Sequence, residues 1–271
     1  MPEGHTIHRL ARDLNATLRG APVEACSPQG RFREEAEQID GSLLAEASAW
    51  GKHLVLDFED APLVHIHLGL IGKLRRSPAD APAVGQIRLR LVGEQDLWDL
   101  TGPMVCALID PDDLAAITDP LGPDPLRAKG KLAQQSREEF VERLGRKRIG
   151  LSAALLDQKV IAGIGNVFRS EFCYLAGIHP ETPANELSAE QANELWDTAV
   201  AQLRQGVKLN RITTRRPEEV GTSAGKISGD DRLYVYKRDG QPCHRCGDEI
   251  RLTEIAKRKA CLLYTSPSPR D

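Results

Sequence analysis

Residues 155–169 read Leu-Leu-Asp-Gln-Lys-Val-Ile-Ala-Gly-Ile-Gly-Asn-Val-Phe-Arg, and this stretch separates two segments of helical periodicity. Gly163 and Gly165 allow a tight turn between them. Backbone N–H groups at the start of the following helix lack intrahelical acceptors and can bind a phosphate, and the Asn166 side chain adds a neutral donor. An ordinary connection between two helices explains the spacing equally well.

The periodicity on both sides of this turn predicts the organisation of the chain. It predicts helices over residues 136–146, 150–158, 167–176 and 188–206, and an amphipathic helix from Glu3 to near Gly20. Alternating apolar and polar residues between positions 43 and 109 predict an antiparallel β unit, a sandwich or a barrel. The segment Leu121–Pro125 predicts the linker, and a short strand is expected over residues 234–236.

Length and composition exclude several classes of protein. The 271 residues suggest roughly two domains. The mean hydropathy is −0.37, and no apolar run reaches the roughly 18 residues that a membrane span needs. The start, MPEGHTIHRL, lacks the apolar stretch of a signal peptide, so a cytoplasmic protein without a membrane partner is expected. The six cysteines do not form the pattern of a disulfide framework.

The net charge of −3 hides an uneven distribution. Residues 201–271 hold 15 Lys and Arg against 9 Asp and Glu, whereas residues 1–200 hold 21 against 30. Local charge, and not its sum, decides whether a surface attracts phosphates. The overall charge therefore does not exclude a nucleic-acid partner, although such basic clusters are commonly only solvated faces.

The first three residues, Met1-Pro2-Glu3, could carry covalent chemistry. Removal of Met1 would leave Pro2 as a secondary amine beside a carboxylate. An α-amino group, with a pKa of about 7.7–8.0, is partly unprotonated near neutral pH and can attack an electrophilic carbon to form an iminium. Because Pro followed by Glu is common at this position, the motif indicates such chemistry only together with other features.

Cys243 and Cys246 form a Cys-x-x-Cys pair that is typical of one half of a structural zinc site. The other half would be a second close pair about 15–20 residues further on. Cys261 follows Cys246 after 14 residues, and no cysteine comes after it. Cys261 is therefore a weaker candidate ligand than the first two.

Six short motifs occur in one order along the chain: Met1-Pro-Glu-Gly, Gly51-Lys52, His67-Leu-Gly-Leu70-Ile-Gly, Leu155-Leu-Asp-Gln with Gly163-Ile-Gly-Asn166, Gly177-Ile-His-Pro180, and Asp239-Gly-Gln-Pro-Cys243-x-x-Cys246-Gly. Together they resemble the formamidopyrimidine-DNA glycosylase / endonuclease VIII family of bacterial base-excision enzymes, over residues 1 to about 258. The resemblance implies an α+β multidomain fold and a structural Zn²⁺. Its parts would be a catalytic β-sandwich over residues 1–120, a helix-two-turn-helix domain over 126–216 and a β-hairpin zinc finger over 230–261. It also implies a monomer that binds damaged double-stranded DNA between the domains.

The resemblance also implies a role for each matching residue. Pro2 would attack C1′ of the damaged nucleotide, Glu3 would act as general acid and base, and Lys52 would hold a phosphate or assist proton transfer. Leu70 would fill the gap left by the flipped base, although without the resemblance it reads as a core leucine. Three further positions match phosphate contacts: His67, Asn166 and Arg258.

The branch of the family follows from two differences. The branch that removes oxidised guanine carries an Arg and a Phe in the stretch that corresponds to residues 99–104, where this chain has Gly102, Pro103 and Met104. Its MPEG start differs from the usual start of that branch as well. Both features favour the endonuclease VIII branch and oxidised pyrimidines such as thymine glycol or dihydrouracil as substrates.

The C-terminus departs from the family pattern. Family members follow the arginine at the position of Arg258 with an aromatic residue and Cys-Pro-x-Cys-Gln, whereas here Cys261 comes about two residues early and the last cysteine is absent. Residues 261–271 resemble a translated sequencing adapter joined to a truncated gene. We therefore expect a non-native tail, an incomplete finger that binds zinc weakly or not at all, and a poorly ordered hairpin.

Three functional hypotheses follow from the sequence. The first is a bifunctional DNA glycosylase and apurinic/apyrimidinic (AP) lyase of base-excision repair in the bacterial cytoplasm, associated with the nucleoid, that acts through a Pro2 Schiff base and β,δ-elimination. The second is a damaged-DNA-binding protein without catalysis. The third, a zinc protein bound to the ribosome or to tRNA, explains the cysteine pair but not the N-terminus.

Overall fold

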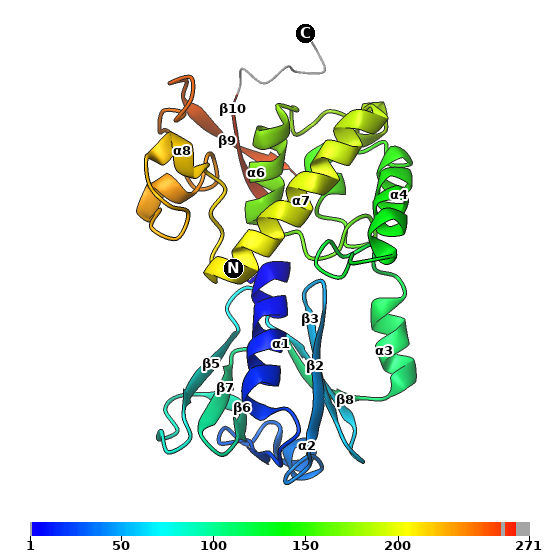
Figure 1. The fold of residues 1–271 in the computed structure, drawn as a ribbon, viewed down its shortest axis with the longest axis vertical. Helices are drawn as coiled ribbons and strands as arrows, with labels where there is room; N and C mark the ends of the chain where they lie inside the picture. The colour runs from blue at the N-terminus through cyan, green and yellow to red at the C-terminus, as the bar shows by residue number, and fades with distance from the viewer. Residues whose placement is uncertain (1, 256–257, 264–271) are drawn as a thin grey trace. The chain divides into compact units, whose positions relative to one another are not determined.

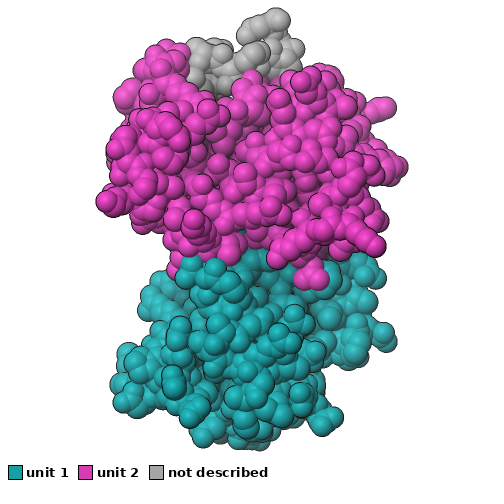
Figure 2. Space-filling view, viewed as in Figure 1, with its two compact units in different colours: residues 1–120 teal, residues 121–271 magenta. Residues whose placement is uncertain are grey.

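The computed structural model describes residues 2–255 and 258–263. The chain divides into two compact units, residues 1–120 and residues 121–271, which Figure 2 colours separately. The predicted non-native tail lies outside the described residues from position 264 onward. Among the helices of the described residues, none combines the length and apolarity needed to cross a membrane.

The first unit holds two antiparallel four-stranded sheets (Figure 1). One sheet has the order β1 (Glu24–Cys26), β6 (Ile87–Val92), β7 (Asp96–Thr101) and β5 (Lys73–Pro78). The other has the order β2 (Leu44–Trp50), β3 (His53–Phe58), β4 (Leu63–His67) and β8 (Val105–Ile109). Three helices belong to this unit: α1 (Gly4–Leu18), α2 (Arg33–Glu37) and α3 (Pro111–Thr118).

Alternation along the strands explains how the two sheets and α1 share one core. Leu54 and Leu56 of β3 and Leu89 and Leu91 of β6 are all buried, and they belong to the same apolar cluster as Leu14 of α1. Side chains two residues apart on a strand point to the same face. The predicted β-sandwich is thus confirmed.

The second unit is helical and carries a hairpin. Its helices are α4 (Leu132–Gly145), α5 (Leu151–Ala154), α6 (Asn166–Ala176), α7 (Ala189–Leu209) and α8 (Pro217–Val220), with 3₁₀ turns at Ala184–Glu186 and Gly229–Arg232. Helix α6 ends where Gly177 adopts a left-handed conformation, and α7 begins with a capping box between Ser188 and Gln191. The helix predicted over residues 150–158 stops at Ala154 because residues 155–165 fold as turns.

One local prediction was wrong. The predicted strand over residues 234–236 does not form, because the carboxylate of Glu171 accepts the backbone N–H groups of all three residues at 2.8–2.9 Å. Those donors are then not available to a neighbouring strand. Helix α3, which was not predicted from the sequence, precedes the linker and begins with Pro111 and a capping box formed by Asp110 and Asp113.

Within the described residues, the C-terminal segment contains two paired strands. Strand β9 (Ile250–Ile255) pairs antiparallel with β10 (Arg258–Leu263). A small apolar cluster supports it, made of Tyr234, Val235, Cys243, Ile250 and Cys261. Tyr174 and Leu175 of α6 pack against this cluster, so apolar burial contributes to holding the hairpin.

Candidate active site and nucleic-acid contacts

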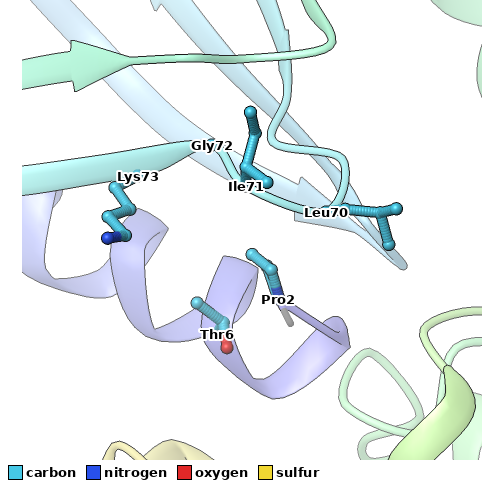
Figure 3. A pocket seen from close by; sticks show the side chains of 6 residues that line it. All are labelled: Pro2, Thr6, Leu70, Ile71, Gly72 and Lys73. Carbon is cyan, nitrogen blue, oxygen red and sulfur yellow. The ribbon is translucent and has the colours of Figure 1, made fainter.

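The N-terminus reaches a pocket in the first unit. Glu3 is fully buried and precedes α1, and its carbonyl oxygen accepts the N–H groups of Thr6 and Ile7. A carboxylate at a helix N-terminus is stabilised by the helix dipole. Pro2 is half-buried and lines a pocket of about 440 Å³ together with Thr6, Leu70, Ile71, Gly72 and Lys73 (Figure 3).

The loop across the pocket from Pro2 is a tight turn that displays apolar side chains. The N–H of Gly72 donates to the carbonyl oxygen of Leu68 at 3.0 Å. A Cβ atom at position 72 would lie 2.2 Å from that oxygen, so only glycine fits. The turn leaves Leu70 and Ile71 with 67% and 78% of their surface exposed, which rules out the interpretation of Leu70 as a core residue.

A second loop touches the first and adds Met104. The N–H of Met104 donates to the carbonyl oxygen of His67, and a Cβ atom at Gly69 would lie 2.9 Å from the Cβ of Met104. Met104 is also largely exposed, so two contacting loops display three apolar side chains, of which Leu70 and Ile71 line the pocket of Pro2. Ile71 was not identified from the sequence as a pocket residue. Its position beside Leu70, between Gly69 and Gly72, could have indicated it, because a tight turn leaves the side chains at its tip exposed.

Lys52 and His67 act on each other electrostatically. Lys52 occupies the turn between β2 and β3, and His67 is the last residue of β4. Burial lowers the pKa of His67, and the charge of Lys52 lowers it further. The Nδ1 atom of His67 accepts the N–H of Gly69 at 3.2 Å, so the neutral ring carries its proton on Nε2. His67 can therefore donate a hydrogen bond without carrying a charge.

The glycine turn of the second unit is organised by Gln158. Its side-chain amide donates to the carbonyl oxygens of Leu156 and Ile164, and its Oε1 accepts the N–H of Gly163. Asn166 is the first residue of α6 and follows Gly165. The turn thus presents the N-terminus of an eleven-residue helix, as the sequence suggested.

Arg169 joins this helix to the hairpin. It is fully buried, and its guanidinium donates to the carbonyl oxygens of Ile255 and Arg258, each at 3.3 Å. The Arg258 side chain itself is exposed. Two candidate phosphate contacts of the second unit, Asn166 and Arg258, thus belong to elements that Arg169 links directly. The first unit holds the other five candidate residues: Pro2, Glu3, Lys52, His67 and Leu70.

The cysteines do not offer a zinc site. Cys243 is buried and accepts the N–H of Arg245 at 3.3 Å, and the exposed Cys246 hydrogen-bonds with it. The sulfur of the buried Cys261 instead accepts backbone N–H groups from residues 237–239. Within residues 2–255 and 258–263, no three His, Cys, Asp or Glu side chains are grouped so as to hold a metal ion. The donor set does not fit the tetrahedral site that structural zinc requires.

Comparison with known proteins identifies the two units. The family model described as "Formamidopyrimidine-DNA glycosylase N-terminal domain" matches residues 1–100, and the model described as "Formamidopyrimidine-DNA glycosylase H2TH domain" matches residues 121–218. The chain belongs to the formamidopyrimidine-DNA glycosylase family. The members of this family are DNA glycosylases of base-excision repair with AP lyase activity, and this chain is one of them.

The family includes relatives from both branches. The chain is 40% identical over 264 residues to Endonuclease 8 1 of Mycobacterium tuberculosis, covering 95% of this chain and 96% of that protein. It is 35% identical over 275 residues to the formamidopyrimidine-DNA glycosylase of a Roseiflexus species, with 95% and 96% covered. Lactococcus lactis Fpg in complex with DNA that contains N7-benzyl-Fapy-dG has the same fold, with a TM-score of 0.77 at 24% identity over 97% of this chain and 98% of that one.

Proposed function

We propose that the chain removes oxidised pyrimidines from double-stranded DNA as a monomer, associated with the nucleoid in the cytoplasm, with the amine of Pro2 as nucleophile. Two observations of the structure support Pro2 as the nucleophile. Pro2 lines a pocket that has room for a nucleoside, and an exposed leucine lies on the loop across that pocket. The higher identity to the mycobacterial Endonuclease 8 1, and Gly102-Pro103-Met104 in the second loop, support a pyrimidine lesion.

The chemistry follows from an unprotonated secondary amine. The nitrogen of Pro2 forms a bond to C1′, the glycosidic bond breaks, and the base leaves with a proton. Glu3 protonates the sugar-ring oxygen as the ring opens, which leaves an iminium between C1′ and the Pro2 nitrogen. Loss of a C2′ proton expels the 3′ phosphate, and loss of a C4′ proton then expels the 5′ phosphate. Water hydrolyses the iminium and restores Pro2.

The other candidate residues bind the DNA. Lys52 and Arg258 neutralise phosphates, His67 donates from Nε2, and Asn166 donates at the N-terminus of α6. Leu70 enters the stack in place of the flipped nucleotide, because an exposed apolar side chain gains free energy by leaving water. No step runs through a zinc ion, since the donor set does not fit one.

Borohydride trapping tests this proposal. Purified chain from which Met1 has been removed, as verified by mass spectrometry, should form a covalent complex with duplexes that contain thymine glycol or an abasic site. The same chain with Met1 retained, whose Pro2 nitrogen is an amide, should not be trapped, while Thr6→Ala, which alters the same pocket without touching the amine, should be trapped like the parent chain. Equal trapping of the chain that retains Met1 would reject the nucleophile, and tight binding without strand cleavage would identify a damaged-DNA-binding protein instead. Excision of oxidised guanine in preference to thymine glycol would reject the pyrimidine assignment.

A further inference from the structure

Three histidines gather on one face of the sheet beside Lys52. His53 opens β3 and lies opposite His67 in the register, and His65 lies two residues before His67 on β4. Since alternate residues of a strand share a face, the three imidazoles lie on the same side of the sheet. The motifs in the sequence do not include His53 or His65.

Their rings are in direct contact. The Nδ1 of His53 lies 2.9 Å from the Nε2 of His65, which is a hydrogen-bond distance. The centroid of the His53 ring lies 5.2 Å from that of His65 and 5.0 Å from that of His67. His53 therefore connects the buried His65 to His67 at the end of the strand.

Burial, together with neighbouring positive charge, lowers the pKa of all three rings and keeps them neutral near pH 7. Burial is the largest cause of a lowered pKa in all three, and it acts together with His65, His67 and Lys52 to lower the pKa of His53 to about 4. His67 lowers the pKa of His65, and Lys52 lowers that of His67. These four side chains are the charged and titratable groups that act on the column. Near pH 7 both rings are thus neutral, so one ring donates the single proton of the hydrogen bond between His53 and His65 and the other ring accepts it.

We propose that His53 and His65 are positioning residues, which hold His67 so that its Nε2–H is directed at a backbone phosphate of the damaged strand. This inference rests on the proposed function, because it assumes that His67 contacts DNA. Three polar rings on a strand face cost more desolvation than three apolar side chains would, so packing alone does not account for them. The hydrogen bond to His65 sets the orientation of His53, and the His53 ring, in contact with His67 at a tilt of 52°, limits the rotation of His67.

Binding to a duplex that contains the abasic analogue tetrahydrofuran tests the proposal. His65→Phe and His53→Phe keep a ring at each position but remove the hydrogen bond, and each should weaken binding about fivefold, the scale of one misaligned hydrogen bond. His65→Gln, which keeps a polar atom near the position of Nε2, should restore most of the affinity. His8→Gln, a histidine of α1 outside the column, serves as the matched control and should bind like the wild type.

The salt dependence separates positioning from loss of charge. Because the column is neutral, the slope of log K against log salt should be the same in His65→Phe and in the wild type. Lys52→Gln should reduce the magnitude of that slope by about 0.9, the value for one phosphate contact. A slope that changes in His65→Phe would overturn the proposal, because it would assign a charge to the column.

Nitrogen-15 NMR of the imidazoles gives a readout that does not need DNA. In the wild type at pH 7, His67 should be neutral with its proton on Nε2, and its signals should shift in His65→Phe even though the two residues share no hydrogen bond. A proton on Nδ1 of His67 in the wild type would overturn the proposal. Unfolding curves that match the wild type show that a variant remains folded.

The outcomes distinguish this inference from the proposed function. A wild-type chain that neither binds the abasic duplex nor is trapped on it would contradict the proposed function. Normal trapping by the wild type, together with unchanged affinity in both His53→Phe and His65→Phe, would contradict the positioning role alone.

Discussion

Leu70 shows how one side chain can be misread without its neighbours. Its apolar character suits a core, but the turn closed by the hydrogen bond from Gly72 to Leu68 leaves most of its surface in water. Leu68, two residues earlier, is 2% exposed and belongs to the core. Two leucines of one loop therefore have opposite environments, which makes them a matched pair for experiment.

We expect Leu70→Ala to change the free energy of unfolding by less than about 0.5 kcal/mol, because the side chain makes no core contacts. Excision should nevertheless fall by about tenfold or more, since the inserted side chain would no longer fill the gap in the stack. Leu68→Ala should instead cost about 2–5 kcal/mol of stability. Chemical denaturation and single-turnover excision measure the two effects. A large loss of stability in Leu70→Ala would show instead that the Leu70 side chain packs in the core.

At the scale of elements, Glu171 joins α6 to a segment more than 60 residues later. Its carboxylate accepts the N–H groups of Tyr234, Val235 and Tyr236 and the hydroxyl of Thr214. The side chain is fully buried, so each of these donors depends on it. A pattern of alternating aromatic and aliphatic residues predicts a strand over 234–236. Nothing in the neighbouring sequence indicates that a carboxylate from a distant helix binds these backbone N–H groups.

Glu171→Gln should lower the free energy of unfolding of the second unit by about 2–4 kcal/mol, because an amide group places donors against backbone donors. Glu194→Gln on the exposed face of α7 is the control, and it should change stability by less than about 0.5 kcal/mol. Urea denaturation, followed by circular dichroism of the helices, checks both values. Equal stability of the two variants would show that water replaces the carboxylate.

The hairpin of β9 and β10 packs on an apolar cluster, and the donor set among the described residues is incomplete for zinc. After a chelator wash, the purified chain should therefore retain well below one zinc ion per molecule by atomic absorption, and EDTA should leave its unfolding temperature unchanged. Cys246→Ser should behave like the parent chain, because the exposed sulfur of Cys246 belongs to no complete donor set. Stoichiometric zinc that survives the wash would contradict this.

At the scale of the whole molecule, the first unit should unfold at a higher pH than protonation of its carboxylates alone would cause. Burial lowers the pKa of His5 and of His53 to about 4 in the folded state, below the ordinary value of 6.5. The unfolded chain therefore binds more protons, so these groups contribute stability above about pH 6.5 that is lost as the pH falls toward 4.

Thermal unfolding measured from pH 7 to pH 4 checks this expectation. The unfolding temperature should fall over that range in the wild type and fall less steeply when His5 and His53 are both replaced by Gln. His8→Gln should follow the wild-type curve. Identical slopes in the double variant and the wild type would show that these histidines are not the groups responsible.

The sequence by itself determined the family, the order of β and helical units, the break at Leu121–Pro125 and the glycine turn before α6, because each depends on local periodicity, turn chemistry or motif spacing. Tertiary structure alone decided that Leu70 is exposed, that residues 234–236 bind Glu171 in place of a strand, and that His53, His65 and His67 form one column. These features depend on side chains that are distant in the chain and meet only through strand register and helix packing. Hydrogen bonds and burial of that kind have no signature within a window of neighbouring residues.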